Sequence, residues 1–227
     1  MGRLLAEAQI GKKQYVAALV CMMLWAGGVQ AFVVSYSGTI DMRDTTWTDS
    51  ITFPKFDPAL GELTSIKFTL SGSVQGSAQF ESLDNSPTTV EMYLTSRVEL
   101  QRPDGSLLVV VFTLANTSDL AAAFDGVVDF AGTSGKTYAD LSGTAMDIAI
   151  SATPADLALF TGPGEISLPV TAAGTSYGSG AGNLLLQFAT AAGATATVEY
   201  TYVPEPITAA FLALGGMFLF YRKRRLN

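Results

Sequence analysis

The chain has 227 residues, one cysteine, no histidine and a formal net charge of −7. The absence of histidine excludes His-dependent catalytic triads and the usual imidazole zinc sites. Charge is uneven along the chain, since residues 32–203 hold eighteen Asp and Glu against six Lys and Arg. Nucleic acid is therefore not an expected partner, because phosphate binding needs Lys and Arg.

Residues 1–31 predict a secretory signal peptide. Basic residues open the segment (Arg3, Lys12 and Lys13), and an apolar run follows from Tyr15 to Trp25. Val29-Gln30-Ala31 then places small residues at positions −3 and −1 of a cleavage site. We expect signal peptidase to cleave after Ala31. The alternative is a retained N-terminal anchor, which the shortness of the apolar run disfavours.

Cys21, the one cysteine, lies inside this apolar run. A lipoprotein signal needs a small residue just before the cysteine, and Val20 is not one. The mature domain is therefore expected to carry no thiol, disulfide or thiolate metal ligand. A domain of this size can bury enough of its surface to fold without disulfides.

Apolar and polar residues alternate with period two along most of residues 32–202. One parity is apolar in three runs: Ile66, Phe68, Leu70, Val74; Val90, Met92, Leu94, Val98, Leu100; Ala196, Val198, Tyr200, Tyr202. The other parity is mainly Thr, Ser, Lys, Arg and Glu. Because successive strand side chains point to opposite faces, each run predicts a strand that buries one face.

Turn signals separate the runs. Arg102-Pro103-Asp104-Gly105-Ser106 predicts a hairpin between neighbouring strands. Three further loops are expected at Asp57–Gly61, Gly132–Gly135 and Ser176–Gly182. One helical turn is expected over Thr153–Phe160, with Thr153 as N-cap and Pro154 at the first helical position. Short strands with Gly- and Ser-rich turns predict an all-β fold, an antiparallel β-sandwich that is jelly-roll-like, over residues 32–202.

Several segments of this domain together resemble the choice-of-anchor E family, whose members share a secreted β-rich domain and differ in their C-terminal anchor. The residues that carry the resemblance are Thr46–Pro58, Leu63–Ile66, Leu83–Asn85, Ala123–Gly126, Asp129–Gly132 and Gly193–Val198. The resemblance covers nearly all of the mature chain. It implies a β-rich secreted architecture and supplies no catalytic residue, because the family has no established activity.

Carboxylates are the remaining candidates for chemistry. Asp125 and Asp129 flank Gly126-Val127-Val128, and with Asp119, Asp84 and Asn85 they offer the oxygen ligands that Ca²⁺ prefers. The spacing is not that of an EF-hand, and Asp at strand ends also serves turns. A facing pair of carboxylates would suit glycoside hydrolysis, but sequence does not reveal facing pairs. No cofactor is expected besides this weak Ca²⁺ candidate.

Aromatic residues raise a second possibility, a platform for sugar binding. The candidates are Trp47, Phe53, Phe56, Tyr177 and Phe188. Most are expected in the core, because aromatic side chains dominate buried area. Trp47 is compatible with either face of its strand, and Tyr177, in the predicted Gly/Ser loop, is expected to be exposed.

The last twenty-five residues, 203–227, have three parts in fixed order. Val203-Pro204-Glu205-Pro206 comes first, then the uncharged run Ile207–Tyr221, then the basic tip Arg222, Lys223, Arg224 and Arg225. As a helix the run would span about 22 Å, enough to seat in a bilayer of ~30 Å if the flanking side chains reach the interface. The basic tip would stay on the cytoplasmic side.

This tail resembles the PEP-CTERM sorting signal of Gram-negative, exopolysaccharide-producing bacteria, which is processed by the membrane enzyme exosortase. The resemblance implies that Pro204, Glu205 and Pro206 are recognised, that 207–221 forms a transmembrane helix, and that the basic tip stops transfer. The alternative is a tail anchor with a proline-rich lead.

These features together lead us to expect an exported, non-catalytic structural protein. It would pass through the inner membrane to the cell surface or extracellular matrix and associate with exopolysaccharide. A carbohydrate-binding surface module and a carboxylate-dependent glycoside hydrolase are the alternatives.

Overall fold

The computed structural model describes residues 30–180 and 182–205. The predicted signal peptide up to residue 29, the apolar run 207–221 and the basic tip lie outside the described residues. Within the described ranges, no helix has both the length and the apolar character needed to cross a bilayer.

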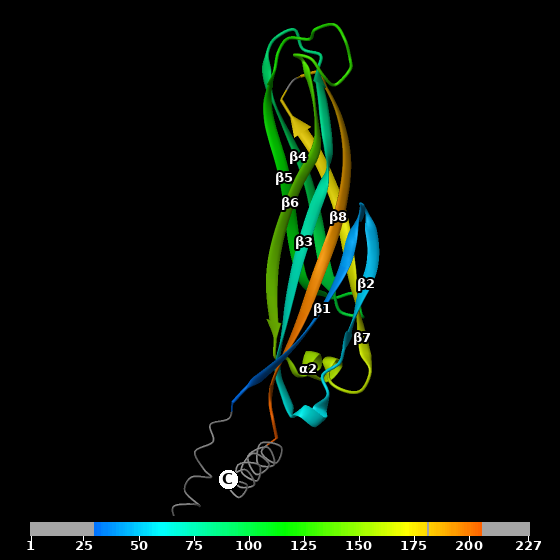
Figure 1. The fold of residues 1–227 in the computed structure, drawn as a ribbon, viewed down its shortest axis with the longest axis vertical. Helices are drawn as coiled ribbons and strands as arrows, with labels where there is room; N and C mark the ends of the chain where they lie inside the picture. Colours follow the sequence, from blue (N-terminus) through cyan, green and yellow to red (C-terminus); the bar gives the residue numbers. More distant parts are fainter. Residues whose placement is uncertain (1–29, 181, 206–227) are drawn as a thin grey trace, which may run out of the picture. The chain divides into compact units, whose positions relative to one another are not determined.

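Strands make up most of the described chain, and they begin at Phe32 (Figure 1). The strands are β1 (Phe32–Asp44), β2 (Trp47–Pro54), β3 (Glu62–Ser82), β4 (Thr88–Gln101), β5 (Leu107–Ala121), β6 (Gly135–Ser151), β7 (Glu165–Ser179) and β8 (Leu184–Val203). A 3₁₀ turn, η1 (Pro58–Leu60), precedes β3, and one short helix, α2 (Pro154–Phe160), lies between β6 and β7.

The strands form two four-stranded sheets, with the order β1-β8-β3-β6 in the first sheet and β2-β7-β4-β5 in the second. All pairings between these strands are antiparallel. The first and last strands pair, as do the second and seventh, the third and sixth, and the fourth and fifth in the chain. This nested pairing is that of an antiparallel ribbon rolled into two sheets, as in eight-stranded jelly rolls. The predicted antiparallel β-sandwich is confirmed.

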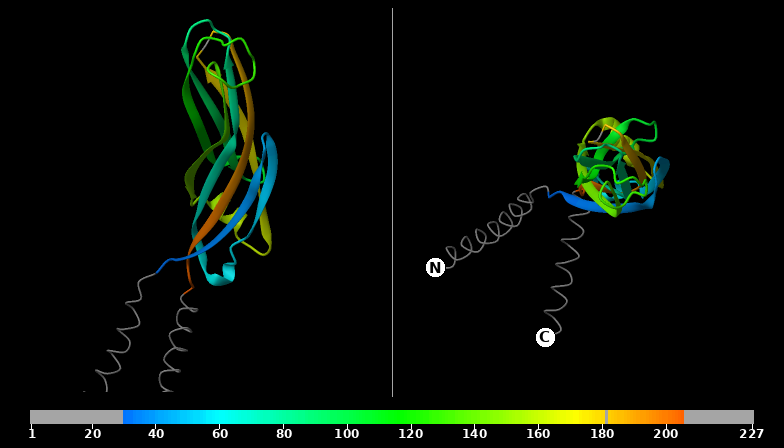
Figure 2. Two further views of the ribbon diagram at one scale, coloured as in Figure 1. Left: turned by 45° about the horizontal axis from the view of Figure 1, so that its top comes forward. Right: turned by 90° about the horizontal axis from the view of Figure 1, so that it is seen from above.

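The strands β1 and β2 cover only the half of the domain where it begins and ends (Figure 2). Strand β1 pairs with β8 from Tyr202 only as far as Ala191, and β2 pairs with β7 only as far as Ala172. Beyond these points each sheet continues as three strands. The far end of the domain, which we call the tip, is formed by the ends of β3, β5 and β7 and the segments that follow them.

The core has two apolar clusters along the strands. The larger cluster includes Phe68, Phe160 and Tyr200, and the smaller one, toward the tip, includes Phe80 and Met92. Small side chains separate the clusters, where Gly72 lies against Thr113. The apolar residues of the three alternating runs face inward, as predicted. All of them are buried except Tyr202, the last residue of the third run, which is half-buried.

Two local predictions are confirmed at the end of the domain near the termini. The backbone of Arg102 closes the β4–β5 hairpin with Ser106 and Gly105, and Gly105 has a φ of 84°. Thr153 caps α2 by accepting a hydrogen bond from the Asp156 N–H at 3.3 Å, with Pro154 in the first turn.

The predicted loop over Ser176–Gly182 is wrong for its first four residues, since β7 continues to Ser179, and Gly180 and Gly182 follow outside the strands. Gly178, inside the strand, is glycine because other atoms come close. A Cβ on Gly178 would lie 3.0 Å from both the Glu91 carbonyl oxygen and a Leu186 methyl carbon. Glycine is favoured in a strand where another backbone comes close, and it is also favoured in flexible loops. The glycine content of the segment therefore did not distinguish a strand from a loop. The orientation of Trp47, left open above, is inward, and its indole N–H donates to the Ala192 carbonyl at 3.1 Å.

Candidate functional site

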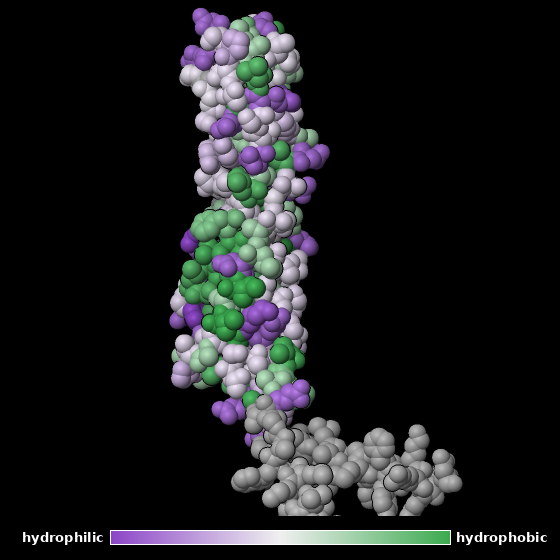
Figure 3. Space-filling view, turned by 90° about the vertical axis from the view of Figure 1, so that its left-hand side faces the viewer, coloured by the Kyte–Doolittle hydropathy of each residue, from purple (hydrophilic) through white to green (hydrophobic). Residues whose placement is uncertain are grey.

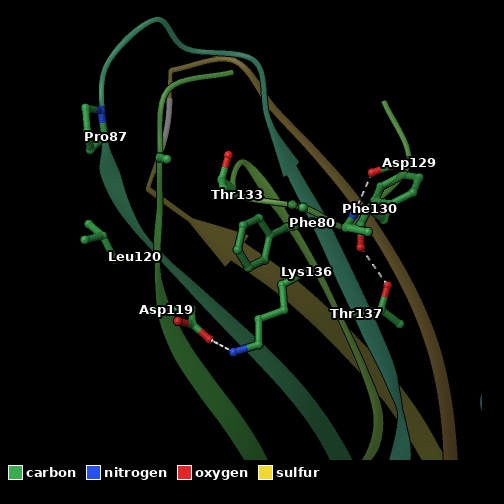
Figure 4. A pocket seen from close by; sticks show the side chains of 13 residues that line it. Phe80, Pro87, Asp119, Leu120, Asp129, Phe130, Thr133, Lys136 and Thr137 are labelled. Atoms are coloured by element: carbon green, nitrogen blue, oxygen red, sulfur yellow. Dashed lines mark hydrogen bonds and ion pairs between the residues drawn. The ribbon is translucent and has the colours of Figure 1, made fainter. Parts of the chain in front are cut away.

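A cavity of about 820 Å³ lies at the tip (Figure 4). Its lining comes from the end of β3 (Phe80), the β3–β4 connection (Pro87), the end of β5 (Asp119, Leu120), the start of β6 (Lys136, Thr137) and the connection between β5 and β6. This volume falls within the usual range for small-molecule sites.

Glu81 holds the wall of the cavity in place. Its carboxylate is fully buried and accepts hydrogen bonds from the Phe130 N–H at 2.8 Å and from the Ser134 hydroxyl at 2.6 Å. The Asp129 N–H also points to it, at 3.4 Å. A buried carboxylate with several donors is a strong tether, because leaving either side unpaired would be costly. Glu81 therefore positions the connection 122–134, with Phe130 held at a φ of 55°.

The polar side of the cavity is an ion pair between Asp119 and Lys136, and Asp119 also accepts a hydrogen bond from the Tyr138 hydroxyl. The bonds from Lys136 and then Tyr138 lower the pKa of Asp119, and the bond to Asp119 raises the pKa of Lys136. Both groups are therefore charged at neutral pH. A carboxyl group with a lowered pKa is poorly suited to act as the general acid of a glycoside hydrolase, which needs a raised pKa.

Apolar groups form the remaining lining. Phe80 is buried beneath the cavity, whereas Leu120 is exposed and Phe130 is half-buried. The Thr137 hydroxyl donates to the Phe130 carbonyl at 3.0 Å. The cavity thus has an apolar floor and, on one side, the Asp119–Lys136 ion pair, whose net charge is zero. Such a lining can hold a small amphipathic group by apolar contacts and hydrogen bonds. Sequence reasoning missed Glu81 and Lys136, and their alternation with apolar neighbours did not distinguish them from ordinary strand residues.

The Asp residues predicted as Ca²⁺ ligands each have separate partners. Asp125 accepts from the Val127 N–H at 3.0 Å and Asp129 from the Ala131 N–H at 2.9 Å, both local turns. Asp84 accepts from the backbone of Gly182 at 2.7 Å, and its backbone oxygen accepts from Phe124. Among residues 30–180 and 182–205, no three His, Cys, Asp or Glu side chains form a group that could hold a metal ion.

Four of the five aromatic candidates belong to the core. Trp47, Phe53 and Phe56 are buried, and Phe188 packs against the smaller cluster. Tyr177 is 51% exposed and stacks on Tyr93, with ring centroids 4.8 Å apart and an angle of 18° between the ring planes. The two tyrosines are direct cross-strand partners on the outer face of the second sheet. Sequence reasoning missed Tyr93, although it lies on the polar parity of its run.

The predicted processing points lie at the end of the domain opposite the tip. Ala31 is exposed just before β1, and Phe32 pairs with Tyr202 in β8. Val203 ends β8 as the partner of Glu62, Pro204 and Glu205 follow it outside the strand, and Glu205 is exposed. Pro206 and the basic tip Arg222–Arg225 lie outside the described residues.

No protein-family model matches the chain, and no curated protein matches it. A solved structure of infectious bursal disease virus, Gt strain, is 15% identical over 80% of this chain and 43% of that chain, with a TM-score of 0.14. Dimeric latent PorU from Porphyromonas gingivalis is 12% identical over 78% and 14%, with a TM-score of 0.24. Desmodium yellow mottle tymovirus is 11% identical over 78% and 84%, with a TM-score of 0.20.

The chain thus spans less than half the length of the first two of these structures. At such identities and TM-scores the likenesses bear on neither the function nor the detailed fold of this chain. The resemblances to choice-of-anchor E and to the PEP-CTERM signal stay predictions.

Proposed function

We propose that the chain is an exported, non-catalytic structural protein of the cell surface or the extracellular matrix, associated with exopolysaccharide and sorted by exosortase. The observation that carries the proposal is the position of the two predicted processing points. Phe32, just after the predicted signal-peptidase site, pairs with Tyr202, and Val203, the first residue of the sorting motif, pairs with Glu62. Both cuts would therefore fall at the same end of the domain.

The length of the strands separates that end from the tip. Strand β3 runs for 21 residues from Glu62, beside Val203, to Ser82, beside Leu184. At about 3.3 Å per residue this is roughly 65 Å. A protein held by its C-terminal segment would present the tip cavity away from the envelope, where matrix components are.

The sorting segment is also suited to recognition by a membrane enzyme. Pro204 cannot donate a backbone hydrogen bond, so the ladder of β8 ends there. Glu205 follows as an exposed residue. An accessible, non-strand peptide directly after the last strand is what a transpeptidase or protease needs to reach.

Intact mass of the protein from its native host, measured in each cell fraction, tests this proposal. We expect a chain that begins at Phe32 and ends near Pro206, with any surplus mass reporting attached glycan or lipid. A chain that retains Arg222–Asn227 in every fraction would mean a plain membrane anchor and would overturn the sorting proposal.

A second candidate function, a carbohydrate-binding module, is favoured by the stacked pair Tyr93 and Tyr177. Sugars bind to exposed aromatic faces, and Tyr177 is 51% exposed on the outer face of the second sheet. Retention of the protein on the host's immobilised exopolysaccharide tests this function, with Tyr177→Ala as the variant. Phe32→Ala is the matched control, because Phe32 is 49% exposed but lies at the other end of the domain. Equal retention of both variants and the parent would remove the tyrosine pair as the binding site.

A further inference from the structure

Five exposed apolar side chains lie along the edge where β5 and β6 meet, and we call them the seam patch. Their exposed fractions are 66% for Phe112, 51% for Leu114, 64% for Met146, 46% for Ile148 and 71% for Ile150. The neighbouring residues of β5, Val111 and Thr113, are buried, so the patch faces outward and is not a displaced part of the core.

The two sheets touch along this edge. A Cβ on Gly143 of β6 would lie only 2.0 Å from the Leu114 carbonyl oxygen of β5. Gly143 pairs with the buried Val74, so this contact lies on the inner face of β6 and brings the backbones of the two edge strands together beneath the patch. Figure 3, which views the side where β5 and β6 lie, shows apolar residues gathered over the half of this face nearer to the termini.

We infer that a second copy of this chain docks on the seam patch. The five exposed fractions add up to about three whole side chains, on the order of 500 Å² of apolar surface, the size at which patches on monomers are often functional. A standard interface takes about 800 Å² from each partner, and homodimer interfaces are about 65% apolar. The seam patch with a polar rim matches both values.

Charged residues form a rim around the patch. Arg97 is the cross-strand partner of Phe112 on the second sheet, and Lys67 is the partner of Ile150 on the first. Within the chain Arg97 pairs with Glu99 and Lys67 with Glu199, so this rim is polar and close to neutral. The acidic residue between the apolar side chains is Asp147, on β6 and exposed.

A twofold axis along the strands would place the first-sheet side of one copy against the second-sheet side of the other. Arg97 of each copy would then face the side of its neighbour that carries Asp147. Gly143 lies beside Leu114, and Arg97 pairs with Phe112. Measured along the strands, Arg97 and Asp147 are therefore offset by about two residues, or roughly 7 Å.

The same axis would leave both chain ends on one side of the dimer, as two copies attached to one membrane require. The patch follows the β5–β6 edge, whereas the terminal strand β1 lies at the opposite edge of the first sheet. Two copies therefore meet without obstruction by their anchors. Only the shared orientation rests on the proposed function, and the dimer itself does not.

Sedimentation of the full-length protein in mild detergent, over a range of concentrations, tests the inference. We expect a dimer for the parent chain, weakened at least about thirtyfold by Phe112→Glu or Ile150→Glu, the effect of an interface hot spot. The matched control is Leu120→Glu, because Leu120 is on the same strand and 68% exposed but lies at the tip. A parent that stays monomeric, or a control that dissociates equally, would overturn the inference. A monomer whose patch binds another protein or lipid would also overturn it.

Cysteine cross-linking keeps the inference testable if a glutamate variant misfolds. The background is Cys21→Ser, which removes the one native cysteine. Phe112→Cys on the second sheet and Met146→Cys on the first lie at nearly the same level along the strands, because Gly143 lies beside Leu114. We expect a mixture of these two single variants to form a covalent dimer under mild oxidation.

Leu120→Cys is the control, and equal cross-linking of the control and the mixture would contradict docking at the seam patch. Cross-linking of the purified protein does not depend on where the protein goes in the cell. A failure of the sorting proposal would instead be seen in the intact mass, as retained C-terminal residues.

Discussion

Arg102 and Asp156 form a two-bond ion pair, with Nε to Oδ1 at 2.7 Å and Nη2 to Oδ2 at 2.8 Å. The pair joins the β4–β5 hairpin to the first turn of α2, two segments 54 residues apart in the chain. The Asp156 side chain is almost fully buried, and its carboxylate also accepts a hydrogen bond from the Ser151 hydroxyl. The backbone N–H of Asp156 donates to the hydroxyl of the N-cap Thr153. This contact closes the end of the larger core cluster over Phe160.

The pair should make folding stability depend on acid pH. Hydrogen bonds from Arg102, opposed by burial and aided by Ser151, lower the pKa of Asp156 to about 2 from its ordinary 3.8. A lowered folded-state pKa contributes stability above pH 3.8 that is lost as the pH falls toward 2. We expect Asp156→Asn to unfold in urea with a free energy about 2 kcal/mol lower at neutral pH, and this gap to close by pH 2.

A gap that stays constant from pH 6 to pH 2 would contradict the assignment of this effect to Asp156 ionisation. Asp49→Asn is the control, since Asp49 pairs with Arg43 on the surface, where both side chains are more than two-fifths exposed. Water and salt screen such a pair, so we expect a much smaller change in unfolding free energy.

Glu81 gives a prediction about the tip. In Glu81→Ala the Phe130 N–H and the Ser134 hydroxyl lose their acceptor, at a cost of about 1–3 kcal/mol for each donor left buried. We expect the connection 122–134 to open to water, which would limit this loss. Amide hydrogen exchange should then be much faster at Phe130 and unchanged at Phe68 in the larger cluster. Unchanged protection of Phe130 would mean that Glu81 does not hold the cavity wall.

Gly143 tests the contact between the sheets. In Gly143→Ala the new methyl group would overlap the Leu114 carbonyl, so β6 must move away from β5. We expect a loss of about 2–3 kcal/mol in unfolding free energy, as for overpacked cores. Gly105→Ala serves as the comparison, because Gly105 has no atom near its Cβ position and only its φ of 84° opposes alanine. That strain costs about 1–2 kcal/mol, and a larger loss at Gly105 than at Gly143 would rule out a close seam.

The sandwich itself could be predicted because its information is local. Alternation identified the inward residues of β3, β4 and β8, since a strand with one buried face must repeat every two residues. The Arg102–Ser106 hairpin and the α2 cap were equally predictable, because their turn and capping residues act on their own neighbours.

The site was not predictable in this way, because it depends on contacts far apart in the chain. Glu81 and Ser134 are 53 residues apart, and Arg102 and Asp156 are 54 apart. Neither pair has a spacing rule. Tyr177 was expected in a loop because the glycines near it in the sequence suggest flexibility. In the structure Gly174 and Gly178 lie in β7, where other atoms come too close for a larger side chain. Tertiary contact decided each of these cases, and the pairing of distant strands set which residues met.

The sorting motif yields the last prediction. Glu205 is exposed and follows the end of β8, so Glu205→Ala should remove a recognised group without disturbing the sandwich. We expect this variant to keep the parent's unfolding midpoint and to accumulate in the membrane fraction with its C-terminal residues retained. Glu165→Ala is the matched control, an exposed glutamate at the start of β7, and it should be sorted like the parent. Normal surface display of Glu205→Ala, measured by protease accessibility of intact cells, would remove Glu205 from the recognised segment. If removal of Arg222–Arg225 also left display intact, exosortase processing would no longer account for the C-terminal segment.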